Sequence, residues 1–419
     1  MEQTQREERT RVALAALFWD ERLEPEGEAS LQELAGLVET AGGEVVGVLT
    51  QHRDRPDART YLGEGKLREL KAFAQANDVE LLVFDNELTP SQIKNIEALT
   101  DCRVFDRSML ILEIFNLHAT TREGKLQVEM AQLKYTLPRL TGKGVELSRL
   151  GGGGGMGARR GKGETKLELQ RRRARDRIAA LREELAALRR TRDEQRRARA
   201  RADLPRVAVM GYTNAGKSTL LNTLTGAGVL AQDQLFATLD PTTRKLTLPG
   251  GAQVLLTDTV GFISNLPHHL IEAFASTLEE VSQADLLLHV VDASNPDCDR
   301  QMQVCQQLIE ELGAGHLPVV TALNKVDLCA GVPLPHLSNA VAISAKTGRG
   351  IDDLLALLEA VLAQGRRTVE LLIPYSQGKL VEQLHEQATV LELSYQEEGT
   401  WLKVRGSEAA LGRVAAWRV

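Results

Sequence analysis

A glycine-rich stretch at residues 211–218 has the residue types and spacing of a loop that wraps around phosphate groups. It follows an apolar run at 206–210 that predicts a strand, and it precedes a helical pattern at 218–225, the context that such a loop requires. Glycines let consecutive backbone N–H groups point at phosphate oxygens. We expect Lys217 to neutralise the β and γ phosphates and Ser218 to place its hydroxyl on Mg²⁺. The predicted nucleotide contacts are Gly211, Tyr212, Thr213, Asn214, Ala215, Gly216, Lys217 and Ser218.

A second motif stands at the end of an apolar run at 253–258, which predicts another strand. It consists of Asp258, Thr259, Val260 and Gly261. A carboxylate there can hold Mg²⁺ through a water molecule, and the glycine N–H can sense the γ phosphate, so the segment that follows can switch between two states. We therefore add Asp258 to the metal site and Gly261 to the catalytic residues.

A third motif selects the base. Guanine presents N1–H and an exocyclic amine side by side, and the carboxylate of Asp327 is a paired acceptor that fits them. Adenine lacks this donor pair and would leave the carboxylate unpaired. Ser344 follows a predicted strand at 340–344, where the backbone can contact the guanine O6. The predicted base contacts are Asn324, Lys325, Val326, Asp327, Ser344, Ala345 and Lys346.

The switch threonine that would complete the Mg²⁺ site must lie between the phosphate loop and Asp258. Thr238, Thr242 and Thr243 are all candidates, and spacing alone does not separate them. Many GTPases place a glutamine directly after the glycine of the second motif, where it orients the attacking water. This chain has Phe262 there. We therefore hypothesise that intrinsic GTP hydrolysis is slow and that a partner completes the site.

Strand and helix patterns place these motifs in one of four predicted domains. Short apolar runs alternate with amphipathic stretches before residue 120 and again after residue 204, which predicts two α/β domains. Between them, two stretches with heptad-type apolar spacing flank a glycine-rich loop and predict an antiparallel helical hairpin. The predicted domains are an N-terminal α/β domain at 1–120, the hairpin at 121–203, the GTP-binding domain at 204–366 and an α+β domain at 367–419.

The amino-acid composition limits the classes of partner that the protein can bind. The net charge is −6, which taken alone disfavours a nucleic-acid binder. The second hairpin segment, 159–202, nevertheless holds 17 Lys and Arg against 7 Asp and Glu. With only 16 Phe, Tyr and Trp in the chain, base stacking is disfavoured, but phosphate contacts need no aromatic residue. The arm is therefore either a solvated face or a surface for structured RNA, with candidate contacts at Arg149, Arg159, Arg160, Lys162, Arg171, Arg172 and Arg173.

The four cysteines are scattered, and none forms a Cys-x-x-Cys pair, which is typical of a reduced cytoplasmic protein. The polar N-terminus is unlike a signal peptide, and no apolar run approaches the ~18 residues of a membrane span. We expect a cytoplasmic monomer with no membrane span, and we leave peripheral association with a membrane open.

Taken together, these residues resemble the HflX family of ribosome-associated P-loop GTPases, in the Obg-like branch. The resemblance extends beyond the general GTPase motifs to 61–66, 84–92, 122–129 and 163–168. The run Phe236, Ala237, Thr238, Leu239 and Asp240 is similar to the family's switch segment, which favours Thr238 as the Mg²⁺ ligand and adds these five residues to the predicted GTP contacts. The hydrophobic Phe262 is also a family trait.

The resemblance implies a GTPase that binds the large (50S) ribosomal subunit and its rRNA and splits or rescues 70S ribosomes under stress. Its predicted catalytic residues are Lys217, Thr238 and Gly261, with Mg²⁺ as cofactor. The alternative is a regulatory GTPase whose basic hairpin binds a protein or a membrane. A nucleotide-independent RNA-binding protein is disfavoured, because the residues that would bind the nucleotide are intact.

Overall fold

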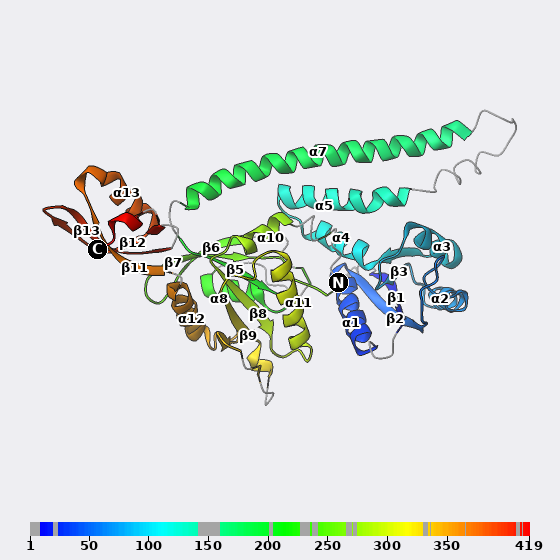
Figure 1. Cartoon of the computed structure of the whole chain (residues 1–419). Coiled ribbons are helices and arrows are strands. Elements are labelled where there is room, and N and C mark those ends of the chain that lie inside the picture. The colour runs from blue at the N-terminus through cyan, green and yellow to red at the C-terminus, as the bar shows by residue number, and fades with distance from the viewer. Residues whose placement is uncertain are drawn as a thin grey trace, which may run out of the picture. The chain divides into compact units, whose positions relative to one another are not determined.

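The structure is a computed structural model that describes 9–19, 24–140, 160–200, 204–226, 235–236, 242–264, 270, 275–329, 334–335, 337–364, 366–407, 411–412 and 414–419. The chain forms two compact units, whose elements are labelled in Figure 1. The first comprises Met1–Ala186, Asp233–Asp240 and Ser264–Ala275, and the second comprises Ala187–Gln232, Pro241–Ile263 and Ser276–Val419. The four domain ranges given above stay a prediction.

The first unit contains a four-stranded parallel sheet in the order β2-β1-β3-β4. Its strands are β1 (Thr10–Phe18), β2 (Gly43–His52), β3 (Leu81–Phe84) and β4 (Arg103–Asp106). Its helices are α1 (Glu24–Thr40), α2 (Glu64–Ala76), α3 (Pro90–Thr100) and α4 (Arg107–His118). The predicted α/β class is confirmed, but the sequence analysis placed neither β4 nor α4.

Both faces of this sheet are covered, because β1 is buried along nearly its whole length. On one face Ala13 and Ala15 pack into a core with Leu67 and Leu70 of α2 and Ile96 of α3. Residues of α1 and α4 cover the other face, where β1 contributes the alternate positions. This alternation is what a strand buried on both sides requires.

Two helices form the predicted hairpin: α5 (Arg122–Thr136) and α7 (Arg160–Ala200). The two helices run side by side (Figure 1). Arg177 forks onto the carboxylate of Glu129 with two 2.7 Å contacts, and Arg122 pairs with Glu184 at 3.3 Å. The helices are antiparallel, because the earlier residue of α5 meets the later residue of α7. In the described part of the chain, no helix is long and apolar enough to span a membrane.

The second unit is built on a six-stranded sheet in the order β10-β9-β8-β5-β7-β6. All neighbouring strands are parallel except β6, which pairs antiparallel with β7. The strands are β5 (Arg206–Gly211), β6 (Thr242–Thr247), β7 (Gln253–Asp258), β8 (Leu286–Asp292), β9 (Val319–Asn324) and β10 (Ala340–Ala342). The helices are α8 (Lys217–Thr225), α10 (Ala275–Ser282), α11 (Cys298–Glu311) and α12 (Ile351–Gln364).

A three-stranded antiparallel sheet in the order β11-β13-β12 closes the chain. Its elements are β11 (Arg366–Ile373), α13 (Gly378–Gln387), β12 (Thr389–Gln396) and β13 (Gly399–Ser407). Leu384 of α13 packs with Leu371 and Leu402 of the sheet, which is the predicted α+β arrangement. After β13, Ala415–Trp417 forms a short 3-10 turn.

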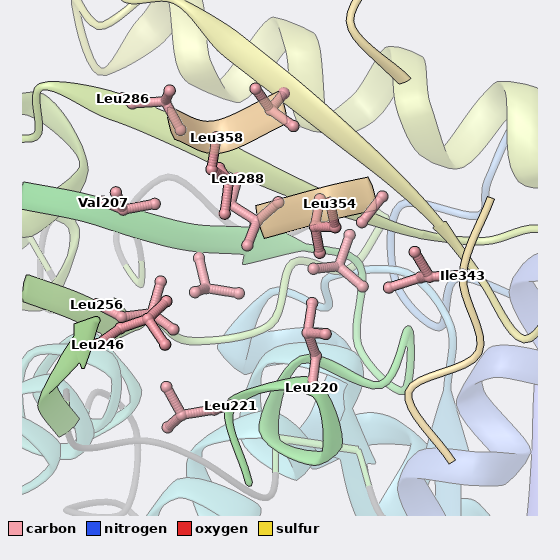
Figure 2. Packing of buried hydrophobic residues seen from close by; sticks show 14 of the residues in the cluster. Val207, Leu220, Leu221, Leu246, Leu256, Leu286, Leu288, Ile343, Leu354 and Leu358 are labelled. Carbon is pink, nitrogen blue, oxygen red and sulfur yellow. The ribbon is translucent and has the colours of Figure 1, made fainter. Parts of the chain in front are cut away.

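The core of the second unit fixes α8, the helix that follows the phosphate loop. Leu220 and Leu221 of α8 point into the same cluster as Leu246 and Leu256 of the sheet (Figure 2). Leu354 of α12 belongs to this cluster too. Because α8 begins at Lys217, this packing sets where the first turn of the helix lies.

Replacing Leu220, which is fully buried, with alanine tests this anchor. We expect Leu220→Ala to lower the free energy of unfolding by about 2–5 kcal/mol, since it leaves a cavity in the core. The measurement is the opening free energy of the slowest-exchanging β8 amides by native-state hydrogen exchange. The matched control Leu328→Ala, at a position that is 65% exposed, should change it by less than about 0.5 kcal/mol. Equal effects of the two variants would contradict the conclusion that Leu220 fixes α8 in the core.

Candidate functional site

The phosphate loop connects β5 to α8 through two positions that only glycine fits. Gly211 has φ 150°, and a Cβ there would lie 2.1 Å from the carbonyl oxygen of Val290. Gly216 has φ 92°, and a Cβ there would lie 2.3 Å from Nδ2 of Asn324. Any side chain would therefore push the loop away from β8 and β9, so the spacing of glycines recognised in the sequence follows from close backbone packing.

Lys217 lies buried inside this loop. Its Nζ donates hydrogen bonds to the carbonyl oxygens of Gly211 at 3.1 Å and Tyr212 at 2.8 Å. Burial lowers the pKa of Lys217, and the negative charge of Asp258 opposes that shift. An ammonium has three donors, so these two bonds hold the group in place while a third N–H can reach an anion in the loop.

The second motif meets the first at the ends of β5 and β7. The Ser218 hydroxyl lies 3.1 Å from Oδ2 of Asp258, which is fully buried at the end of β7. The Thr259 hydroxyl donates to the carbonyl oxygen of Val209 at 2.7 Å and ties the motif to β5. A hydroxyl beside a carboxylate is a set of hard oxygen donors that suits Mg²⁺. In the described residues, no group of three or more His, Cys, Asp or Glu forms a further metal site.

The residue after the second motif is held by its backbone. Phe262 accepts a hydrogen bond from Thr213 N–H at 2.7 Å and donates one to the carbonyl oxygen of Gly211 at 3.1 Å. Its ring is 2% exposed. A Cβ on Gly261 would lie 2.9 Å from Nζ of Lys217, so the backbone of this motif lies directly against the lysine. Phe262 therefore helps to build the loop and offers no polar side-chain group to a water molecule.

The base-selecting motif is joined to the phosphate loop through Asn324. Its Nδ2 donates to the carbonyl oxygen of Ala215 at 2.8 Å, and its Oδ1 accepts the N–H of Ala345 at 2.9 Å. Both bonds are buried. One side chain thus fixes the phosphate loop, β9 and the turn after β10 relative to one another.

Two contacts in this region were not predicted from the sequence. Lys325 has a left-handed backbone, and its Nζ pairs with Asp292 at 2.7 Å. The hydroxyl of Ser344 hydrogen-bonds to Asp327 and holds the pKa of that carboxyl below its usual value, with smaller contributions from Lys346 and Lys325. An acidic residue at the end of β8 was the available signal for the first contact, but the sequence does not show that β8 and β9 are neighbours.

The predicted switch residues are placed less completely. Ala237, Thr238, Leu239 and Asp240 lie outside the described residues. Phe236 is described and belongs to the first compact unit. Thr242 and Thr243 lie in β6, where the Thr243 hydroxyl meets that of Thr257 at 3.0 Å, so both are part of an edge strand.

The candidate RNA contacts lie on the hairpin or beyond its described part. Arg149 and Arg159 fall outside the described residues, and the side chains of Arg160 and Lys162 do as well. Arg172 and Arg173 are exposed on α7, and Arg171 is half-buried. The sequence-predicted contacts with RNA stay a prediction.

The fold and this arrangement define a P-loop GTPase: a mixed α/β sheet, a glycine loop around a buried lysine, a hydroxyl–carboxylate pair and a guanine-type base motif. Family models match the chain as GTP-binding GTPase N-terminal over 28–116, as GTP-binding GTPase Middle Region over 118–199 and as 50S ribosome-binding GTPase over 206–325.

Curated relatives match the sequence of this chain over most of its length. GTPase HflX of Lacrimispora saccharolytica is 48% identical over 94% of this chain and 92% of its own length. GTPase HflX of Caldanaerobacter subterraneus is 48% identical over 90% of this chain and 88% of its own length. GTPase HflX of Escherichia coli is 40% identical over 88% of this chain and 88% of its own length. The chain belongs to the HflX family of GTPases, so it binds and hydrolyses GTP.

Changing Asp327 to asparagine tests the base contact. Asparagine cannot accept from both guanine donors, and loss of a charged hydrogen bond of about 1.5–3 kcal/mol predicts about 10- to 150-fold weaker GTP binding. Its amide N–H instead suits the C2 carbonyl of xanthine, so binding of xanthosine triphosphate should strengthen. Equilibrium titration with fluorescent nucleotides measures both, and Asp353→Asn, an exposed position at the start of α12, is the control. Unchanged GTP affinity in Asp327→Asn would refute the contact.

His289 on β8 predicts a pH dependence of stability. Burial, together with the smaller effect of the nearby charge of Lys217, lowers the pKa of His289 to about 4. Between pH 6.5 and about 4 the unfolded chain takes up a proton that the folded chain does not, so the free energy of unfolding falls as the pH falls. The slope is about 1 kcal/mol per pH unit from this group. Calorimetric melting across this range should give a shallower pH slope for His289→Leu, and an identical slope would contradict the assignment.

Proposed function

We propose that this GTPase binds the large ribosomal subunit in its GTP-bound state and splits 70S ribosomes under stress, acting as a cytoplasmic monomer. The observation that carries the proposal is the combination, in one chain, of the phosphate-loop, Asp258 and Asp327 motifs with a basic antiparallel arm. The match of residues 206–325 to a family described as 50S ribosome-binding GTPase supports it.

In the proposed reaction, the phosphate loop and Lys217 hold the β and γ phosphates of GTP. Ser218 and Thr238 would hold Mg²⁺ together with Asp258. The Ser218 hydroxyl beside the buried Asp258 carboxylate supports this ligand set. Bound Mg²⁺ would neutralise charge that develops on the phosphates during transfer. Gly261 N–H would contact the γ phosphate, and Asp327 would hold the guanine.

Hydrolysis is proposed to be slow until the ribosome completes the site. Phe262 occupies the position from which other GTPases orient the attacking water, and its ring is buried with its backbone bonded to the phosphate loop. It cannot turn a polar group toward the nucleotide. A group supplied by the partner can restore water positioning and stabilise charge, an effect worth 10³–10⁵ in rate for other GTPases.

The hairpin is the proposed ribosome contact. Residues 168–192 of α7 hold nine Arg against four acidic residues. Arg177 is held by Glu129 across the hairpin, whereas Arg172 and Arg173 are exposed along the helix. Guanidinium groups spaced along a rigid helix can contact the phosphates of structured RNA without reading bases. Arg149, Arg159, Arg160 and Lys162 would extend this surface toward the hairpin tip.

The test compares GTP hydrolysis with and without purified 50S subunits. We expect at least tenfold stimulation by 50S subunits, and we expect deletion of 150–163 to abolish splitting of 70S ribosomes while GTP binding is retained. Arg172→Glu with Arg173→Glu should weaken 50S binding at least tenfold. The charge-matched control Arg59→Glu with Arg68→Glu, at exposed positions of the N-terminal domain, should not. Absence of stimulation would favour the regulatory GTPase with a protein or membrane partner.

A further inference from the structure

Two short segments from the GTP-binding part of the sequence are packed with the N-terminal part of the chain. The described residues of Asp233–Asp240 and Ser264–Ala275 belong to the same compact unit as those of Met1–Ala186. The first segment contains Thr238, the proposed Mg²⁺ ligand. The second begins three residues after Gly261, the proposed γ-phosphate contact. The N-terminal domain therefore touches the chain at positions that lie, along the sequence, two or three residues from both groups that would respond to the third phosphate.

The first segment is held by an aromatic contact. The ring of Phe236 packs edge-on against the ring of Phe115 in α4, with ring centres 4.8 Å apart and an interplanar angle of 77°. The two rings are 3% and 1% exposed. Phe236 has φ 58°, a left-handed conformation that costs about 1–3 kcal/mol for such a residue and persists only where the surroundings enforce it. The packing against α4 supplies that enforcement.

The neighbouring residue is held by α1. The N–H of Leu235 donates to the Thr40 hydroxyl at 3.2 Å, and that hydroxyl donates in turn to the carbonyl oxygen of Gly36 at 2.8 Å. A Cβ at Gly36 would lie 3.2 Å from Cδ1 of Leu235. A glycine inside a helix lowers stability by about 1 kcal/mol relative to alanine. The close approach of Leu235 explains why position 36 nevertheless has no side chain.

The second segment is held by Arg107, the first residue of α4. Its Nη2 donates to the carbonyl oxygen of Ser264 at 3.2 Å, and the same guanidinium pairs with Asp85 at 2.6 Å and with Glu33. Arg107 is 2% exposed. A guanidinium buried between two carboxylates is expensive to displace, so it presents a rigid donor to this segment.

These contacts lie at the carboxyl-terminal edge of the N-terminal sheet. Asp85 follows β3 and Arg107 follows β4, at the carboxyl ends of the parallel strands. The strand order β2-β1-β3-β4 reverses between β1 and β3, and doubly wound sheets bind their ligands at that edge. Here Arg107 contacts the carbonyl oxygen of Ser264 as well as Asp85, Glu33 and Ser30.

We propose that α1 and α4 of the N-terminal domain hold both nucleotide-responsive segments by direct contacts, so that the conformation of this domain depends on whether GTP or GDP is bound. A change in the position of Thr238 or Gly261 between the GTP-bound and GDP-bound states would pull on Phe236 and Ser264 and so change the packing of α4. Coupling between two sites is reciprocal, so a partner that repositions the N-terminal domain also changes the relative affinity for GTP and GDP. The inference rests on the proposed roles of Thr238 and Gly261 and does not require the ribosome.

Hydrogen–deuterium exchange of the full chain, read by mass spectrometry, tests this coupling. Two samples of the chain are compared, both with Mg²⁺: one is saturated with GDP and the other with a non-hydrolysable GTP analogue. We expect amides of α1 and α4 to exchange at rates that differ at least threefold between the two nucleotides. Phe115→Leu removes the ring that supports Phe236 and should reduce that difference by at least half. Phosphate-loop amides should stay protected by both nucleotides.

Two further variants separate coupling from simple destabilisation. Phe73→Leu is the matched control, because Phe73 lies on α2 and packs against the opposite face of the sheet; it should keep the wild-type difference. Thr40→Val keeps the side-chain shape but removes the acceptor for Leu235, and it should reduce the difference without unfolding the domain. Equal exchange of α1 and α4 with both nucleotides in the wild-type chain would overturn the proposal while leaving ribosome binding untouched. Loss of phosphate-loop protection in the wild-type chain would overturn the nucleotide site as well.

Discussion

The buried ammonium of Lys217 is the constraint on which the nucleotide site depends. Removing a charge from water is costly unless oxygen atoms replace its hydration, and burial lowers the pKa of this lysine accordingly. The replacement oxygens are the carbonyls of Gly211 and Tyr212, which can converge only because the loop passes against Val290 without a side chain. A bound phosphate completes the compensation, so the loop is built to gain from anion binding.

The remaining parts of the site hold that loop in position. Asn324 joins it to the base-selecting turns with two buried hydrogen bonds, and Phe262 joins it to the second motif through the backbone. Leu220 fixes the helix that begins at Lys217. Because the phosphate loop, the proposed metal ligands and the proposed base contact share these links, a nucleotide bound at one end should order the other.

Motif spacing predicted most of this site but not its long-range contacts. The phosphate loop, Asp258 and Asn324 each follow a strand and carry their own chemical signature, so position along the chain was sufficient. The pairing of Lys325 with Asp292 depends on which strands are neighbours. The local pattern of apolar residues predicts each strand but does not predict the order of the strands in the sheet. The contact of Phe236 with Phe115 joins residues more than a hundred positions apart. The strand β4 has four residues, too few for a recognisable alternation.

The claim that Lys217 is a buried charge completed by phosphate is tested most directly by thermal unfolding of the wild-type chain and of Lys217→Met, each with and without GDP and Mg²⁺. At 100-fold excess of GDP over its Kd, binding should stabilise the wild-type nucleotide domain by about 2.7 kcal/mol. We predict that Lys217→Met is at least as stable as the wild-type chain without nucleotide and gains almost nothing at the same GDP concentration. A variant that gains as much as the wild-type chain, or that is much less stable without nucleotide, would contradict the account.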